Sequence, residues 1–292
     1  MKELVIISGK GGTGKTSTVA AFAALASDVV LADCDVDAAN LHLILSPTIR
    51  DRQEFLGGNR ATIDASDCIG CGQCQQYCRF EAIHPAPDGM TYVVDPLACE
   101  GCGVCERFCP AQAIQFAPAV NGEWYRSDTR YGPMIHARLG IAEENSGKLV
   151  TLVRRKAKET AQAQGLSLMI TDGSPGIGCP VIASVTGADQ VLLVTEPTPS
   201  GLHDLERVVQ LLQRFQLPGM VCVNKADINQ ELTEGIEAYA VAKGLLSVGR
   251  IPYSAKVTAA QTQGLSVIEY ADGEDAIASS LRGIWERVTQ RL

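Results

Sequence analysis

No apolar stretch in this sequence is long enough to cross a bilayer, which takes roughly 20 consecutive apolar residues in a helix. Clusters of Lys and Arg are also absent: 25 basic residues stand against 33 acidic ones, for a net charge of −8. Nucleic acids and anionic membranes attract clustered cations, so neither is expected as the main partner. The apolar run Leu4-Val5-Ile6-Ile7 leads directly into a glycine-rich segment and leaves no room for a signal peptide. We therefore expect a cytoplasmic protein that makes no membrane contact.

The glycine-rich segment, Gly9 to Thr16, reads GKGGTGKT and matches the pattern GxxxxGK[ST]. The following stretch, Thr16 to Ala26, is compatible with a helix and has no proline to stop it. A glycine-rich turn between a strand and a helix points backbone N–H groups at an anion, and the helix dipole adds to the attraction. Lys15 is expected to reach the outer phosphates, and the Thr16 hydroxyl to bind Mg²⁺. The predicted nucleotide-binding residues of this loop are Gly11, Gly12, Thr13, Gly14, Lys15, Thr16 and Ser17.

A second lysine, Lys10, directly follows the first glycine of this loop. With it, the loop resembles the deviant phosphate loop, KGGxGKT, of the MinD, ParA and nitrogenase iron protein group of ATPases. In that group this lysine reaches across a dimer interface to the nucleotide of the partner subunit. The resemblance implies two subunits that sandwich two ATP molecules, as a homodimer or as a heterodimer with a related ATPase. It also implies that Lys10 acts in catalysis.

Three carboxylates, Asp33, Asp35 and Asp37, follow an apolar segment that is predicted to be a buried strand. Ligands in open α/β sheets bind at the carboxyl ends of strands, so these acids are expected beside the phosphate loop. The stretch through Asn40 resembles switch I of the MinD group, which has the form DxDxxxxN. That resemblance implies that Asp35 orients the attacking water and that Asp33 lies nearer the outer shell of the metal. It does not explain Asp37.

A second apolar segment, Leu166 to Thr171, is followed by Asp172, and an apolar strand ending at an acid is the Walker B arrangement. Asp172 is therefore predicted to hold Mg²⁺ through water. The next residues resemble switch II of the MinD group, which implies that the Gly176 N–H faces the γ-phosphate.

Two more core strands are predicted at Val191 to Thr195 and Met220 to Val223, and the second leads to Asn224. Asn224 resembles the base-contacting asparagine of the MinD group, and Pro252 falls in the kind of segment that lies over the base in these folds. The tetrapeptide that begins at Asn224, NKAD, also matches the guanine-reading motif NKxD of GTPases. The family favours ATP, and GTP stays open.

Between these motifs the sequence repeats a cysteine pattern at an offset of thirty-one residues. The pattern, Cx₂Cx₂Cx₃C, begins at Cys68 and again at Cys99. Two such runs are the bacterial ferredoxin pattern for two [4Fe–4S] clusters, in which the fourth cysteine of each run binds the other cluster. The predicted ligands are Cys68, Cys71, Cys74 and Cys109 for one cluster, and Cys99, Cys102, Cys105 and Cys78 for the other. The alternatives are structural zinc, and clusters that only stabilise a small core.

The other three cysteines, Cys34, Cys179 and Cys222, are expected to pack as small hydrophobic residues. A bridging role for Cys179, like that of the cluster cysteines of the nitrogenase iron protein, is the less favoured alternative. Near the end of the sequence, apolar residues from Ile277 to Leu292 recur at helical spacing. MinD uses a terminal amphipathic helix to reach the membrane, but the polar face here is not strongly basic, so we expect this helix to dock on its own core.

The whole chain resembles MinD-type ATPases that contain an inserted ferredoxin domain, which are relatives of the Mrp scaffold ATPases. The expected fold is a doubly wound, mostly parallel α/β sheet with helices on both faces, and a small α+β ferredoxin insert. The predicted boundaries are 1–50 and 121–292 for the ATPase core and 51–120 for the insert. Within the second part of the core, Lys148 to Val153 is predicted as a strand, followed by a helix from Arg154 to Gln164.

Three functions agree with these motifs. The first is an ATP-hydrolysing redox protein in which ATP, Mg²⁺ and two [4Fe–4S] clusters act together and an unidentified redox or cofactor-accepting protein is the partner. The second is an ATPase for assembly of iron-sulfur or metal cofactors. The third is a MinD-like positioning ATPase whose clusters are sensors or staples. Eight assigned ligands favour the first, because cluster delivery needs labile, exposed cysteine pairs.

Overall fold

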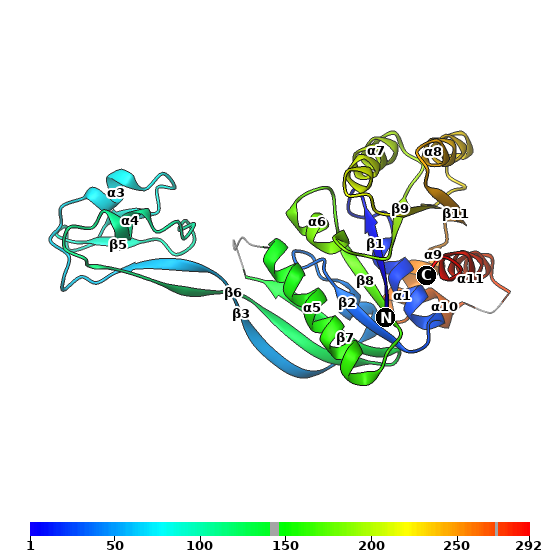
Figure 1. The fold of residues 1–292 in the computed structure, drawn as a ribbon, viewed down its shortest axis with the longest axis horizontal. Helices are drawn as coiled ribbons and strands as arrows, with labels where there is room; N and C mark the ends of the chain where they lie inside the picture. Colours follow the sequence, from blue (N-terminus) through cyan, green and yellow to red (C-terminus); the bar gives the residue numbers. More distant parts are fainter. Residues whose placement is uncertain (141–145, 272–273) are drawn as a thin grey trace. The chain divides into compact units, whose positions relative to one another are not determined.

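We describe the fold from a computed structural model of the chain, in which residues 1–140, 146–271 and 274–292 are described. A nine-stranded sheet is the central feature of these residues. Its strands are β1 (Lys2–Ser8), β2 (Val29–Asp33), β3 (Thr48–Ile63), β6 (Ile114–Thr129), β7 (Gly132–Leu139), β8 (Leu168–Pro175), β9 (Gln190–Thr195), β10 (Gly219–Asn224) and β11 (Leu246–Ile251). Their order in the sheet is β11-β10-β9-β1-β8-β2-β7-β6-β3 (Figure 1). A separate antiparallel pair is formed by β4 (Ile83–Pro85) and β5 (Tyr92–Val94).

Helices cover both faces of the parallel part of this sheet. The described residues form the helices α1 (Lys15–Leu25), α2 (Leu41–Leu45), α3 (Gln73–Tyr77), α4 (Val104–Arg107), α5 (Ser146–Gln164), α6 (Cys179–Val185), α7 (Pro199–Arg214), α8 (Gln230–Ala242), α9 (Ala255–Thr262), α10 (Val267–Tyr270) and α11 (Ala276–Thr289). Of these, α3 and α4 do not cover the parallel strands but belong to a separate, smaller hydrophobic cluster. One core cluster joins α1, α2, α10 and α11 to the sheet, and a second joins α6, α7 and α8. This doubly wound arrangement confirms the predicted fold class.

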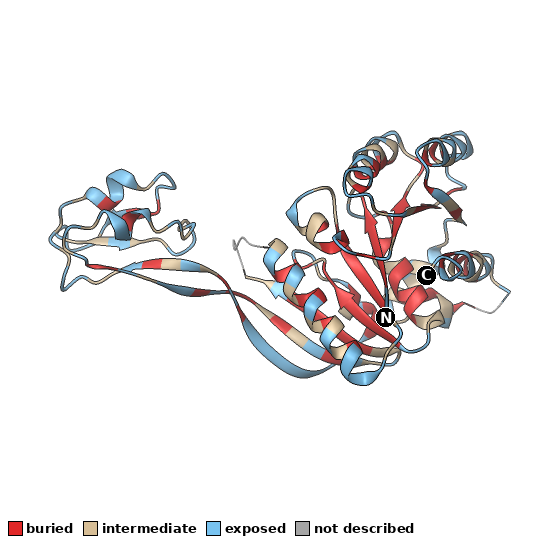
Figure 2. Ribbon diagram, in the orientation of Figure 1, coloured by how far each residue is buried: buried red, intermediate tan, exposed pale blue. Residues whose placement is uncertain are grey.

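The alternation of apolar residues along β1 explains the two layers. Leu4 and Ile6 belong to the first core cluster, whereas Val5 and Ile7 belong to the second. Successive side chains of a strand point to opposite faces, so a strand that is apolar throughout is buried on both sides. Figure 2 shows this as a band of buried strands between helices whose outer faces are exposed.

The seven neighbouring strands from β11 to β7 are parallel. Their carboxyl ends therefore lie along one edge of the sheet. That edge brings Ser8, Asp33 and Asn224, which end β1, β2 and β10, to the same side of the molecule. The positions predicted to bind nucleotide are thus placed by the strand order itself.

The predicted strand from Lys148 to Val153 is wrong, because these residues form the first half of α5. Within α5 the buried residues include Leu149, Val153, Ala157 and Ala161, which recur every four positions and therefore line one helical face. The helix packs against α6 and β2 through that face.

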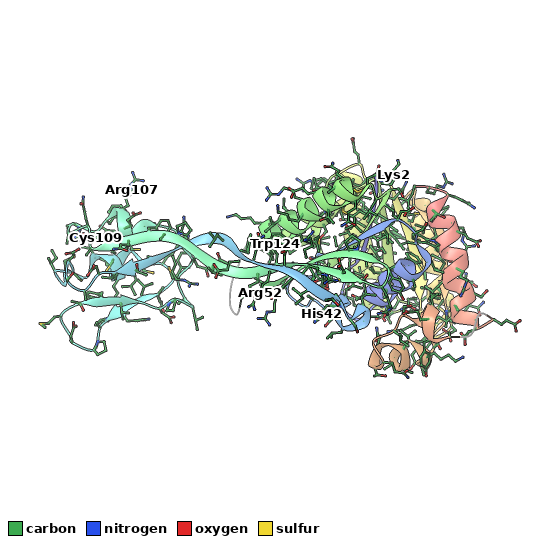
Figure 3. The ribbon with its side chains drawn as sticks, turned by 90° about the horizontal axis from the view of Figure 1, so that it is seen from below. Lys2, His42, Arg52, Arg107, Cys109 and Trp124 are labelled. Atoms are coloured by element: carbon green, nitrogen blue, oxygen red, sulfur yellow. The ribbon has the colours of Figure 1, made fainter. Side chains whose placement is uncertain are left out.

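The chain forms two compact units. The larger contains Met1–Arg52, Trp124–Arg138 and Ser146–Leu292, and the smaller is built on Gln53–Glu123 with the segment that begins at Leu139. The chain passes from one unit to the other within two long strands, near Arg52 on β3 and near Trp124 on β6 (Figure 3). The smaller unit contains α3, α4, β4 and β5 as well as the eight cysteines of the repeat.

The last helix, α11, docks on the core as expected. Its buried face includes Ile277, Leu281, Ile284 and Val288. Each such side chain contributes about 1.5–3 kcal/mol when it is fully removed from water. No helix in the described parts of the chain is both long and apolar enough to cross a membrane.

Candidate nucleotide and cysteine sites

An open cleft of about 660 Å³ lies at the carboxyl ends of the parallel strands. This volume is within the usual range of ligand pockets, about 300–1,000 Å³. The phosphate loop, α2, α9 and the residues that follow β10 and β11 form its walls. The predicted site residues that line the cleft are Gly11, Gly12, Gly14, Lys15, Thr16, Ser17, Asp35, Asn224 and Pro252.

Lys15 is the charged group at the base of this cleft. Its side chain is 6% exposed, and its Nζ donates to an oxygen of Asp172 and, at 3.3 Å, to Asp35 Oδ2. Burial opposes the charge of Lys15, but Asp172 and Asp35 together outweigh it and raise the pKa of the ammonium. Lys15 therefore stays protonated, which suits a group that is predicted to bind phosphate oxygens.

Two fully buried acids, Asp33 and Asp172, face each other across the β2 and β8 strands. Asp33 Oδ1 accepts the Asp35 N–H at 3.1 Å. The other oxygens, Asp33 Oδ2 and Asp172 Oδ2, have no hydrogen-bond partner among the described residues. Burial and the nearby Asp172 carboxylate raise the pKa of Asp33 well above its usual range. Buried carboxylate oxygens without partners fit a divalent cation that prefers oxygen ligands, such as Mg²⁺.

Asp35 lines the cleft and is half-buried. Burial is the main cause that raises its pKa, with Asp172 adding to the effect and Lys15 opposing it. Its neighbour Asp37 is exposed and does not line the cleft.

Asn224 holds the phosphate loop. Its Nδ2 donates to the Thr13 carbonyl at 2.8 Å, and its Oδ1 accepts the Lys225 N–H at 2.9 Å. Gly14 makes this approach possible: its φ is +91°, and a Cβ there would lie 2.2 Å from Asn224 Nδ2. The nitrogen and the oxygen of the Asn224 side-chain amide are thus both hydrogen-bonded within the chain, although the side chain also lines the cleft.

The other side of the loop is held by Gln261, a residue that sequence analysis missed. Gln261 extends from α9 and donates from Nε2 to Ser17 Oγ at 2.8 Å. No motif marks a glutamine that acts from the opposite wall of a cleft, so only the fold reveals it.

In this structure the N–H of Gly176 is used within the chain, so its contact with the γ-phosphate stays a prediction. Its N–H donates to the Ser8 carbonyl at 2.9 Å, and Gly176 is not among the residues that line the cleft. The positive φ of Gly176, +90°, turns the chain back toward β1, which brings the N–H to Ser8.

A model of the CobQ/CobB/MinD/ParA nucleotide-binding domain family matches residues 4–267. The chain belongs to this family. It is an ATP-binding P-loop ATPase of the MinD/ParA type.

Individual proteins are also similar to this chain in sequence or in structure. An uncharacterized protein of Methanocaldococcus jannaschii is 36% identical over 230 residues, which is 78% of this chain and 79% of that protein. The cell-division ATPase MinD of Pyrococcus furiosus is 17% identical, with a TM-score of 0.59 over 100% of this chain and 99% of that one. The septum site-determining protein MinD of Pyrococcus horikoshii, complexed with Mg-ADP, is 18% identical, with a TM-score of 0.58 over 98% and 95%. At these identities the two solved structures show a shared fold.

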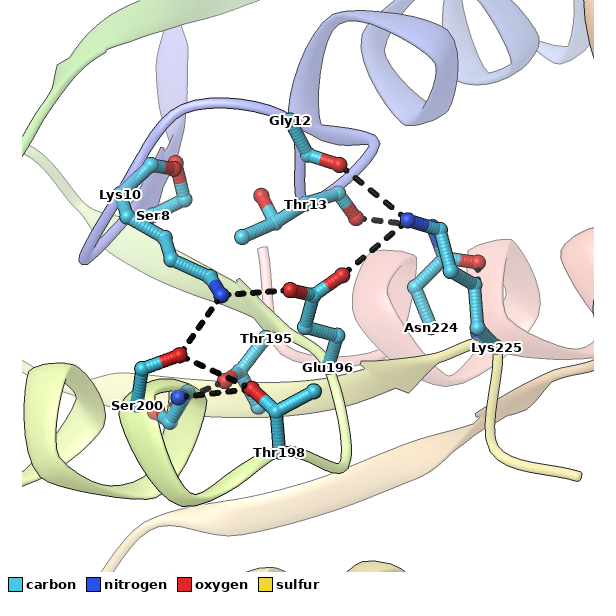
Figure 4. A network of polar contacts seen from close by, with 11 residues as sticks. Ser8, Lys10, Gly12, Thr13, Thr195, Glu196, Thr198, Ser200, Asn224 and Lys225 are labelled. Atoms are coloured by element: carbon cyan, nitrogen blue, oxygen red, sulfur yellow. Dashed lines mark hydrogen bonds and ion pairs between the residues drawn. The ribbon is translucent and has the colours of Figure 1, made fainter. Parts of the chain in front are cut away.

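In this MinD/ParA-type ATPase, Lys10 is part of a second cluster of charges (Figure 4). Lys10 Nζ pairs with Glu196 Oε1 at 2.6 Å and donates to Ser200 Oγ at 2.9 Å. Lys225 Nζ binds the other oxygen of Glu196 at 3.1 Å. Burial raises the pKa of Glu196, but the hydrogen bonds from Lys10 and Lys225 outweigh it and hold the pKa below its usual value. Sequence analysis missed Glu196, which follows β9 and has no motif of its own.

The eight cysteines of the repeat form two groups of four in the smaller unit. Each group lines one small cavity of about 20 Å³. The first cavity is lined by Cys78, Cys99, Cys102 and Cys105, and the second by Cys68, Cys71, Cys74 and Cys109. Among the described residues, no group of three or more His, Cys, Asp or Glu side chains is placed so that it could hold a single metal ion.

The backbone around the two cavities repeats as the sequence does. The glycines that precede α3 and α4, Gly72 and Gly103, have φ values of +72° and +75°. Ala82 donates its N–H to Cys78 Sγ at 3.4 Å, and Ala113 donates in the same way to Cys109 Sγ at 3.4 Å. Backbone N–H groups that point at cysteine sulfurs are typical of cluster-binding loops.

The remaining cysteines differ from one another. Cys34 and Cys222 are buried as expected, and burial raises the pKa of both thiols. Cys179 is exposed, so the expectation that it packs as a small hydrophobic residue is wrong. It occupies the first position of α6, at the exposed end of the helix and two residues before the buried Val181.

Proposed function

We propose that the chain is an ATPase in which ATP-dependent pairing of two chains controls electron transfer through two [4Fe–4S] clusters. The observation that carries this proposal is the presence, in one chain, of a nucleotide cleft and of two cavities that are each lined by four cysteines. An unidentified redox or cofactor-accepting protein would be the partner of the smaller unit.

The donor sets fit two clusters. Each cavity collects three cysteines from one run and the fourth from the other, which is the ligand pattern of two-cluster ferredoxins. Apolar residues such as Ile83, Val94 and Phe116 complete the first cavity and would limit the access of water. When bound, the clusters supply one-electron redox chemistry.

On the nucleotide side, this chain's own residues bind and orient the substrate. The N–H groups of the phosphate loop and the Lys15 ammonium would hold the phosphates, and Thr16 with Asp172 would hold Mg²⁺. Asp35, which like Asp172 forms an ion pair with Lys15, would orient the attacking water. Asn224 and Gln261 keep the loop in place from two sides.

Lys10 would complete the site of a second chain. In the single chain it is bound to Glu196 and Ser200 and does not line the cleft. Its side chain is 30% exposed, so it can leave Glu196 when a partner's nucleotide offers a stronger anion. The partner would be a second copy or a related ATPase.

Metal analysis tests the cluster proposal. Protein purified without oxygen should contain about eight irons and about eight acid-labile sulfides per chain, as two [4Fe–4S] clusters require. Cys109→Ser should damage only the cluster held with Cys68, Cys71 and Cys74. Cys179→Ser is the matched control, because Cys179 lies outside both cavities. Zinc in place of iron, or two intact clusters in Cys109→Ser, would overturn the ligand assignment.

Two other functions have support. The fold of MinD supports a positioning ATPase, for which ATP would leave the cluster potentials unchanged. Cys71 and Cys102 are exposed, which favours cofactor assembly, since labile clusters need accessible ligands. Clusters that an iron chelator removes within minutes, and that an apo-acceptor protein takes up, would support assembly.

A further inference from the structure

Arg130 joins three parts of the larger unit at the turn between β6 and β7. Its Nε and Nη2 bind the two oxygens of Glu269, at 2.6 and 2.8 Å. Its Nη1 donates to the Leu45 carbonyl at 2.9 Å, and its Nη2 also donates to the carbonyls of Ile44 and Gly264, at 3.1 and 3.0 Å. A guanidinium bound in this way has little freedom to move, because its planar fork is fixed on several sides at once.

The three carbonyls that Arg130 binds lie at the ends of α2 and α9, two helices that form walls of the nucleotide cleft. Ile44 and Leu45 end α2, the helix that directly follows the switch I segment, and Ile44 itself lines the cleft. Gly264 follows α9, whose residue Gln261 holds the phosphate loop. A Cβ at Gly264 would lie 2.9 Å from Ser46 Oγ, so the end of α9 is in close contact with the end of α2.

The turn that holds Arg130 also lies next to the larger-unit ends of β3 and β6, the two strands that lead to the smaller unit. Strand β3 begins at Thr48, directly after α2 and its cap, and β6 ends at Thr129, next to Arg130. Two reciprocal ion pairs tie these strands together: Arg50 to Asp128 at 2.6 Å and Arg126 to Asp51 at 2.7 Å. The chain attaches β3 to α2, and Arg130 attaches β6 to α2.

We propose that Arg130 is the positioning residue that transmits occupancy of the nucleotide cleft to strands β3 and β6. The proposal deepens the proposed function, on which it rests for the role of the cysteine unit. A nucleotide that orders or moves α2 and α9 acts on both anchors of β6, and a ligand can bias a distant element only through such differential contacts. Without Arg130, β6 would be linked to α2 only indirectly, through its pairing with β3.

Hydrogen exchange measured by mass spectrometry tests this inference on the anaerobically purified full chain. A non-hydrolysable ATP analogue should slow exchange in peptides from 48–63 and 114–129 by at least about fivefold, the lower end of typical couplings. In Arg130→Gln the effect on 114–129 should fall below the effect on 48–63, because only the indirect link through β3 remains. The affinity for the analogue should stay within about threefold, because Arg130 does not line the cleft.

Arg250→Gln is the matched control. Arg250 also binds a carboxylate with two nitrogens, since its Nε and Nη2 donate to Glu237 Oε2 at 3.1 and 2.6 Å, but it lies on β11, far from β6 in the strand order. It should keep the wild-type response. Glu269→Gln provides a second variant if Arg130→Gln does not fold, and it should weaken the response on 114–129 in part.

The inference fails if the analogue leaves both strands unchanged in the wild type, or if the effect on 114–129 survives in Arg130→Gln and Glu269→Gln. These outcomes are independent of the clusters, because exchange is measured on the backbone. A chain that responds through Arg130 but contains no iron would refute the proposed redox function and leave this inference standing.

Discussion

Glu196 offers a way to change the pairing of two chains at a residue that does not itself line the cleft, although its partner Lys225 does. Glu196 holds Lys10 at 2.6 Å, and the two side chains are 14% and 30% exposed. A partly exposed, charge-assisted pair of this kind contributes about 1–2 kcal/mol, between the values of surface pairs and of buried charged hydrogen bonds. Lys10 must give up this interaction to reach a partner's nucleotide, so a dimer of two copies breaks two such pairs, at a cost of about 2–4 kcal/mol. A neutral hydrogen bond in place of each pair is about half as strong and would remove about half of this cost.

The substitution Glu196→Gln weakens the hold on Lys10 but keeps the shape of the side chain. We expect it to tighten ATP-dependent dimerisation by about 5- to 30-fold in Kd, the equivalent of about 1–2 kcal/mol. Sedimentation velocity with a non-hydrolysable ATP analogue measures this Kd. Lys10→Ala should bind the analogue and remain monomeric. A dimer Kd in Glu196→Gln that is unchanged or weaker would refute the idea that Glu196 restrains Lys10.

Three further predictions concern folding and the cysteine unit. Arg154→Ala should lower the free energy of unfolding in urea by about 3 kcal/mol, since it leaves the buried Glu3 carboxylate without its bidentate partner at 2.8 and 2.7 Å; a loss below 1 kcal/mol would contradict this. Burial lowers the pKa of His136 to about 4, below the unfolded value near 6.5, so its stabilising effect is complete above pH 6.5 and is lost as the pH falls toward 4. Between pH 7 and pH 5, the free energy of unfolding in urea should therefore fall by about 2 kcal/mol less for His136→Gln than for the wild type. An equal fall in both proteins would contradict the lowered pKa of His136. Gly101→Ala should cost more stability and more bound iron than Gly89→Ala, because both have positive φ but only the first places a Cβ 2.1 Å from a backbone carbonyl; equal effects would show that the contact is unimportant.

Short-range patterns predicted the parts of the fold that depend on near neighbours. The phosphate loop is a strand, a glycine turn and a helix that are contiguous in the sequence, so its conformation follows from local chemistry. The cysteine repeat is equally local, because each cavity takes three of its four cysteines from one run. These features needed no knowledge of the sheet order.

Other features could not be predicted from local sequence patterns, because contacts between distant segments determine them. The segment Lys148 to Val153 contains short apolar stretches that suit a strand or a helix, and only its packing against α6 and β2 shows that it is helical. Strand β7 was not predicted, because it is placed by pairing with β2. Glu196 and Arg130 act on residues far away in the sequence, so no spacing or motif could identify them.

The most direct test of the proposed redox function is a potentiometric titration of the anaerobic protein with and without a non-hydrolysable ATP analogue. A coupling of about 1–3 kcal/mol between nucleotide and cluster, the typical range, corresponds to a shift of about 40–130 mV for a one-electron couple. By reciprocity, reduction should change the affinity for the analogue by the same factor. Lys15→Ala, which should not bind the analogue, is the control and should show no shift. Midpoint potentials that stay identical, with an affinity that does not respond to reduction, would contradict the proposal that this ATPase controls its clusters through its nucleotide.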